Sequence, residues 1–249
     1  SGESTCTLGE VRNRADLVAF WGSDPVDSHP RHLERYAVDV PGLFCPRGRT
    51  DRQVVVVDVK PTQTAEKADL FYQIHAGGDF DLLWALRGVL RGLTPEKESV
   101  AGIPTSRVLE LAERLRTCRF GIVFFGLGLA RAGSRTVEAL LRLSIDLNHH
   151  TRFYVRRMRV SGDVAGADSV LAWQTGYPFA VNLARGWPRY NPGEFTGPDM
   201  LARGEIDVCL FVGGAGVRRF EPAARAALAS IPTILLDGPD VPASFEPTV

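Results

Sequence analysis

The chain contains few lysines, no excess of either charge and no long apolar run. Lys60, Lys67 and Lys97 are the only lysines among 29 basic residues, and 29 acidic residues balance them. A net charge of zero argues against a dedicated nucleic-acid binder, whose binding face is usually basic. No apolar run reaches the roughly 18 residues of a membrane span. We therefore expect neither nucleic acid nor membrane as a partner, and an N-terminus without signal-peptide features predicts a cytoplasmic protein.

Cysteine is also scarce, and its spacing excludes several kinds of metal site. The four cysteines are scattered and none lies three positions from another, as the CxxC motif requires. Such spacing gives neither a zinc motif nor an iron–sulfur motif. We predict reduced thiols and no metal-binding residues in this chain.

The most informative stretch of the sequence is residues 53–90. Val54–Val57 is a β-branched apolar run of the kind found in parallel strands that are covered on both faces. Ligands in open α/β sheets bind outside the carboxyl ends of such strands. Asp58, Lys60 and Thr62 follow this run and are candidates for contacting a nucleotide-like ligand. The alternative is that Asp58 only caps a turn, since acidic residues commonly occupy turns.

Helical and strand patterns alternate along the chain, which predicts an α/β fold with doubly wound, mostly parallel sheets. Residues 105–118 form the clearest amphipathic helix, and strands are expected at 17–21, 120–125 and 206–212. A glycine-rich turn at 126–133 can hold a phosphate or simply be a tight turn. We expect one α/β part over residues 1–100 and a second over 101–249.

An irregular segment at residues 174–198 interrupts the second expected part. It is aromatic, rich in arginine and broken by prolines, and irregular segments inside compact domains often have a function. One interpretation is an anion or carboxylate site, because arginine binds such groups bidentately. Its candidate residues are Arg185, Arg189, Tyr190 and Asn191. The other interpretation is a surface lid held by the packing of Trp187 and Tyr190.

Three stretches together resemble a known family. They are LGEVRNRADLVAFWGSDPVDSHPRH, VVVVDVKPTQTAEKADLFYQIHAGGDFDLLWAL and YPFAVNLARGWPRYNPGEF. They are similar to the B subunit of formylmethanofuran dehydrogenase, in the molybdopterin oxidoreductase superfamily. The resemblance implies that two turns hold a pterin guanine dinucleotide, the first with Gly22, Ser23 and Asp24 and the second with Asp58, Lys60 and Thr62. It also implies that Arg185 or Arg189 assists catalysis.

The sequence departs from that family where redox chemistry is concerned. It has no CxxCxxxC segment, and no cysteine is followed by the histidine that accompanies the metal-binding cysteine. A soft metal of this kind requires a thiolate or selenolate besides the pterin. We therefore expect a superfamily core without its iron–sulfur and C-terminal pterin-covering domains, with the cofactor positions vestigial and no cofactor or metal bound by this chain.

A degenerate form of this subunit occurs in the bacterial formyltransferase/hydrolase complex, and the resemblance implies that role here. The chain would be a non-redox scaffold for an amidohydrolase-like subunit that hydrolyses a formylated methanofuran-type carrier to formate. Its partners would be that subunit, a formyltransferase subunit and a further subunit. The alternatives are a metal–pterin dehydrogenase subunit acting on CO2 and formate, and a nucleotide-binding regulatory module.

Overall fold

The computed structural model describes residues 5–159, 164–238 and 245–248, and these residues form two compact units. The described residues up to 159 belong to the first unit, and those from 164 onward belong to the second. The expected boundary between residues 100 and 101 lies inside the first unit. That expectation failed because strands on both sides of residue 100 pair in one sheet.

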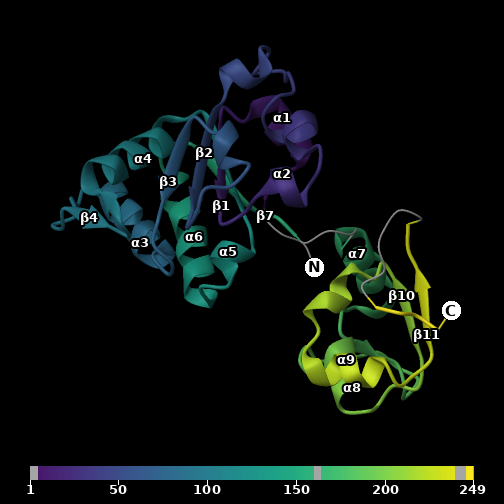
Figure 1. Cartoon of the computed structure of the whole chain (residues 1–249). Coiled ribbons are helices and arrows are strands. Elements are labelled where there is room, and N and C mark those ends of the chain that lie inside the picture. The colour runs from purple at the N-terminus through teal and green to yellow at the C-terminus, as the bar shows by residue number, and fades with distance from the viewer. Residues whose placement is uncertain (1–4, 160–163, 239–244, 249) are drawn as a thin grey trace. The chain divides into compact units, whose positions relative to one another are not determined.

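The first unit contains a five-stranded parallel sheet in the order β3-β2-β1-β6-β7 (Figure 1). The strands are β1 (Leu17–Trp21), β2 (Gln53–Asp58), β3 (Leu70–Gln73), β6 (Phe120–Phe125) and β7 (Arg152–Arg157). β1 pairs with β2 from Leu17↔Gln53 and with β6 from Leu17↔Gly121. The predicted α/β class and parallel sheet are confirmed.

Helices cover both faces of this sheet. They are α1 (Leu8–Arg14), α2 (Pro25–Ser28), α3 (Asp79–Leu90), α4 (Thr105–Thr117), α5 (Leu127–Ala130) and α6 (Ser134–Leu147). A short hairpin, β4 (Ser99–Val100) with β5 (Ile103–Pro104), precedes α4. α1 begins where the sequence dictates, because Thr7 and Glu10 form a reciprocal capping box.

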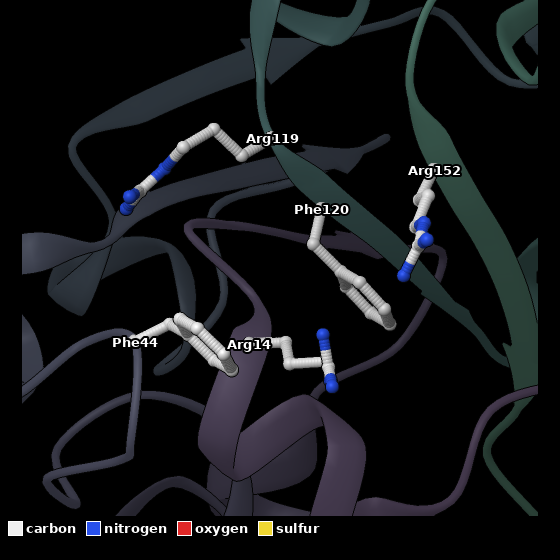
Figure 2. Close-up of a pocket in the computed structure, with 5 residues that line it drawn as sticks. All are labelled: Arg14, Phe44, Arg119, Phe120 and Arg152. Carbon is white, nitrogen blue, oxygen red and sulfur yellow. The ribbon is translucent and has the colours of Figure 1, made fainter.

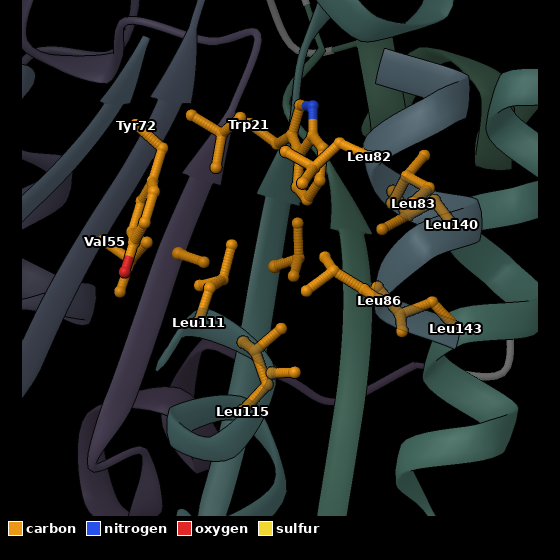
Figure 3. Packing of buried hydrophobic residues seen from close by; sticks show 14 of the residues in the cluster. Trp21, Val55, Tyr72, Leu82, Leu83, Leu86, Leu111, Leu115, Leu140 and Leu143 are labelled. Atoms are coloured by element: carbon orange, nitrogen blue, oxygen red, sulfur yellow. The ribbon is translucent and has the colours of Figure 1, made fainter. Parts of the chain in front are cut away.

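Alternate residues of each strand point to opposite faces, so the sheet separates two hydrophobic cores. On one face Trp21 and Val55 pack against leucines of α3, α4 and α6 (Figure 3), and Val57 belongs to the same cluster. On the other face Phe20 and Val56 pack against α1 and the turn at residues 33–38. Fully burying one such side chain contributes roughly 1.5–3 kcal/mol. The strand sequences are continuously apolar because helices cover both faces of the sheet.

The second unit is smaller. Its elements are α7 (Val164–Thr175), β8 (Val181–Asn182), β9 (Arg189–Tyr190), α8 (Gly197–Ala202), β10 (Cys209–Val212), α9 (Pro222–Leu228) and β11 (Thr233–Leu236). β10 and β11 are parallel, whereas β8 and β9 form an antiparallel hairpin. A core of Leu201, Val217, Ala224 and Leu228 joins α8 to α9. None of the helices in the described ranges is both long and apolar enough to cross a bilayer.

Candidate functional site

The sheet of the first unit has its switch point between β1 and β6. From β1 the chain continues to β2 and β3 on one side, whereas β6 and β7 lie on the other. In open α/β sheets the ligand-binding crevice lies outside the carboxyl ends of the strands at such a point. Six of the predicted site residues lie at this edge, because Asp58 ends β2 and the other five lie in the turns after β1 and β2.

Gly22, the first residue after β1, is fixed by main-chain packing. It has φ +55°, and a Cβ placed on it would lie 2.4 Å from the main-chain nitrogen of Leu129. Its own N–H donates to Val57 O at 2.9 Å, and the Gly128 N–H donates to Gly22 O at 3.0 Å. The turn after β6 therefore rests directly on the turn after β1. The N–H groups of Gly22 and Gly128 are used within the fold and do not fit a pyrophosphate cradle.

Ser23 and Asp24 also have partners inside the protein. The Ser23 hydroxyl donates to Phe124 O at 3.3 Å. The Asp24 carboxylate accepts hydrogen bonds from the Thr64 hydroxyl at 2.6 Å, the Thr64 N–H at 3.1 Å and the Gln63 N–H at 3.2 Å. Asp24 thus joins the loops that follow β1 and β2. These contacts give both residues a structural role, and their vestigial cofactor role stays a prediction.

The turn after β2 is more open. Asp58 is half-buried, and its carboxylate accepts the Val59 N–H at 2.7 Å. Burial raises the pKa of Asp58, and the negative charge of Asp79 adds to the increase. The Lys60 side chain is exposed, whereas the Thr62 hydroxyl accepts the Ala65 N–H at 3.1 Å. Lys60 is thus the exposed member of this turn, whereas Asp58 and Thr62 accept main-chain hydrogen bonds, and the cofactor role of all three stays a prediction.

Asp79 lies beside these turns, and its role was not apparent from the sequence. The N-cap of α3 is Gly78, and Asp79 is the first helical residue. Its carboxylate is buried and accepts the Trp21 indole N–H at 2.7 Å. This bond ties the end of β1 to the start of α3. An acidic residue after two glycines at a helix start was the available signal, but its partner lies 58 positions away in the chain.

The other four predicted site residues lie in the second unit, on and beside the β8–β9 hairpin. Arg189 donates to Asn182 Oδ1 at 2.9 Å, and its guanidinium lies 4.7 Å from the centre of the Phe195 ring. Its buried Nε has no hydrogen-bond partner in the described ranges. Tyr190 stacks on Tyr177 at 5.0 Å with the rings 3° apart.

The remaining contacts of this segment are more exposed. Asn191 donates to Glu194 at 2.7 Å, and Arg185 is exposed at the turn of the hairpin. Trp187 is 57% exposed, so its packing does not hold the segment closed. Aromatic stacking of Tyr190 supports the lid interpretation, and the exposed Arg185 leaves the anion interpretation open.

The thiols are poorly suited to binding a metal. Burial raises the pKa of Cys6 to about 11 and that of Cys118 to about 12, and it also raises the pKa of Cys45 and Cys209. Metal ligation requires the thiolate, which burial in apolar surroundings disfavours. In the part of the chain that the structure describes, no group of three His, Cys, Asp or Glu residues could hold a metal ion. The expectation that this chain binds no cofactor stays a prediction.

No family model matches the sequence, but two known proteins are similar along nearly all of it. The chain is 42% identical over 243 residues to the B subunit of the tungsten-containing formylmethanofuran dehydrogenase 2 of Methanocaldococcus jannaschii. It is 40% identical over 245 residues to the subunit of the same name from Methanococcus maripaludis. The chain is homologous to a part of the formylmethanofuran dehydrogenase B subunit. The alignments cover 97% and 98% of the chain but only 56% of each relative.

A solved structure and a more distant relative agree with this assignment. The crystal structure is that of the formyltransferase/hydrolase complex from Methylorubrum extorquens with methylofuran, which matches with a TM-score of 0.68 and 25% identity. The match covers 95% of this chain and 61% of the chain in that complex. Formate dehydrogenase H of Escherichia coli is 23% identical over 208 residues, covering 72% of this chain and 28% of that enzyme. The resemblance to the B subunit of formylmethanofuran dehydrogenase is thereby confirmed.

Proposed function

We propose that this chain is part of a non-redox B subunit in a formyltransferase/hydrolase complex. In that complex it is a scaffold for an amidohydrolase-like subunit, which hydrolyses a formylated methanofuran-type carrier to formate in the cytoplasm. The observation that carries the proposal is the structural match to the formyltransferase/hydrolase complex, with a TM-score of 0.68 over 95% of this chain. The four cysteine thiols agree with this proposal, because burial raises the pKa of each of them and so disfavours the thiolate.

The same contacts support a scaffold role for the vestigial cofactor positions. Gly22 joins the turns after β1 and β6, and Asp24 joins the loops after β1 and β2, so contacts within the protein support the shape of this edge of the sheet. Asp58 and Lys60 would then supply polar surface rather than bind a pterin. The partners are the hydrolase subunit, a formyltransferase subunit and one further subunit.

Affinity purification of the tagged full-length protein from its native host tests this proposal. We expect an amidohydrolase-like zinc subunit and a formyltransferase subunit to co-purify in fixed ratio. Recovery of the protein with iron–sulfur electron-transfer subunits instead would contradict the proposal, and so would recovery of the protein alone.

A second candidate is a metal–pterin formylmethanofuran dehydrogenase subunit. The favouring observation is the higher identity, 42%, to a tungsten-containing enzyme than to the hydrolase complex, 25%. In this case residues outside these 249 would supply the metal ligand, and Asp58 and Lys60 would contact the nucleotide end of the cofactor. Electron transfer from formate to a dye by the purified complex would support this candidate and count against the first.

A further inference from the structure

A basic pocket lies at the edge of the sheet opposite the predicted cofactor positions. It has a volume of about 200 Å³ and lies at the amino ends of β6 and β7, beside the last turn of α1. Its lining consists of Arg14, Phe44, Arg119, Phe120 and Arg152 (Figure 2). None of these residues takes part in the site described above.

Two of the three arginines in this pocket form no ion pair within the described residues, although capping hydrogen bonds and, to a lesser extent, the charge of Arg14 lower the pKa of Glu10 on the same helix. Arg119 pairs with Asp16 at 3.0 Å. In contrast, neither Arg14 nor Arg152 has a carboxylate within 4 Å among the residues that the structure describes. Figure 2 shows both guanidinium groups reaching toward the space beside the Phe120 ring, with Arg119 directed elsewhere. Two like charges that face one space repel each other, and an anion between them would relieve the repulsion.

The apolar part of the pocket is aromatic. Phe120 is buried, whereas Phe44 is 48% exposed and lies beneath the Arg14 guanidinium at 4.9 Å. Aromatic residues and arginine are enriched among the residues that contribute most of the binding energy in protein–protein interfaces. A volume of about 200 Å³ is below the roughly 300–1,000 Å³ of small-molecule sites. It suits the end of one side chain better than a nucleotide.

We propose that this pocket receives the carboxylate of an aspartate or glutamate from another subunit of the complex. The planar guanidinium groups of Arg14 and Arg152 would bind the carboxylate, and Phe44 would cover its aliphatic stem. The inference rests on the proposal that the chain works as one subunit of a complex. It adds a docking point that is separate from the carboxyl edge of the sheet.

A double substitution, Arg14→Gln with Arg152→Gln, tests the charge requirement in the full-length protein. We expect the partner subunits to dissociate at lower salt, with an affinity at least tenfold weaker than for the wild type. The matched control is Arg131→Gln with Arg135→Gln, which removes the same charge from exposed positions at the end of α5 and on α6. Equal stability of the two variant complexes would overturn the inference.

A photo-cross-linking amino acid at position 44, used in the assembled complex, identifies the occupant. We expect a cross-link to an acidic segment of another subunit, and that cross-link should be lost in the double arginine variant. Cross-links only within the same chain, or none, would overturn the inference while leaving the proposed function intact. A wild-type protein that purifies without any subunit would overturn both.

Discussion

His32 shows how burial of one polar side chain couples the fold to pH. It is 8% exposed and lies edge-on to Phe124 at 4.8 Å. Burial, with smaller effects of His29 and Arg156, lowers its pKa from 6.5 to about 4. The unfolded chain therefore takes up the proton first as the pH falls. The contribution of neutral, buried His32 to the unfolding free energy is fully present above pH 6.5 and is lost progressively as the pH falls toward 4.

The corresponding prediction is a loss of about 2 kcal/mol in unfolding free energy between pH 7 and pH 5. The His32→Phe variant should show much less of this pH dependence, because the neutral ring keeps the packing and has no proton to gain. The exposed His150→Gln variant serves as the control and should behave as the wild type does. Urea unfolding at both pH values measures the effect. An identical pH dependence for His32→Phe and the wild type would rule out this explanation.

Arg52 is a second buried polar residue, and it acts on the main chain. Its guanidinium donates to the carbonyl oxygens of Ala15 at 3.1 Å, Val38 at 2.9 Å, Val40 at 2.6 Å and Arg12 at 2.5 Å. It thereby joins α1 and the loop before β2 to the amino end of the sheet. Four carbonyl oxygens would lose this donor if the side chain were removed, and the oxygen of Ala15 would keep only the weak thiol donor of Cys45 at 3.4 Å.

We expect Arg52→Met to lower the unfolding free energy by about 3 kcal/mol or more, since buried acceptors without donors are costly. Arg116→Met is the control. Arg116 forms only an exposed ion pair with Glu113, so its loss should change stability by no more than about 0.5 kcal/mol. Thermal unfolding of both variants provides the comparison, and similar shifts in Tm would contradict the assigned role.

At the scale of elements, the turns after β1 and β6 depend on the absence of a side chain at Gly22. Gly22→Ala should cost about 3 kcal/mol, because it combines a positive φ with a clash against main-chain atoms. Gly77→Ala separates the two effects. Gly77 has φ +81°, but a Cβ at this position would have no atom within 4 Å, so only about 1 kcal/mol is expected. Equal losses in urea unfolding would show that the close approach does not matter.

The sequence predicted the elements with the strongest local patterns. The strands around Val54–Val57 and at residues 120–125 were found because continuous apolar runs mark strands buried on both faces. The helix expected at 105–118 is α4, Thr105–Thr117. The β8–β9 hairpin was not found, because strands of two residues carry no detectable alternation.

The site was less predictable than the elements because its contacts join distant parts of the chain. The sequence placed Asp24 and Asp58 correctly at strand ends, and nothing local indicated which of them would be engaged. Asp24 is bound by Thr64, 40 positions away, whereas Asp58 accepts a bond from its own neighbour Val59. Local sequence patterns can predict the contact of Asp58 with its neighbour, but they cannot predict the contact of Asp24 with Thr64.

At the scale of the molecule, alternating helices and strands do not reveal where one unit ends. The expected boundary at residue 100 failed because β6 and β7 return to the sheet begun by β1. Only long-range pairing decides this, because the break in the sequence pattern just after residue 100 is a short hairpin within the first unit and not a boundary. The family resemblance did not depend on that boundary, since it rested on three stretches inside the region that the homologues match.

The central claim is that this B-subunit fold contributes shape and docking without redox chemistry. The most direct test is the tungsten, molybdenum and pterin content of the intact complex, purified without oxygen from its native host. We predict less than about one-tenth of a metal or pterin per copy of the subunit, because a non-redox subunit has no use for either. A stoichiometric tungsten- or molybdenum-bound pterin would contradict the claim and establish the dehydrogenase alternative.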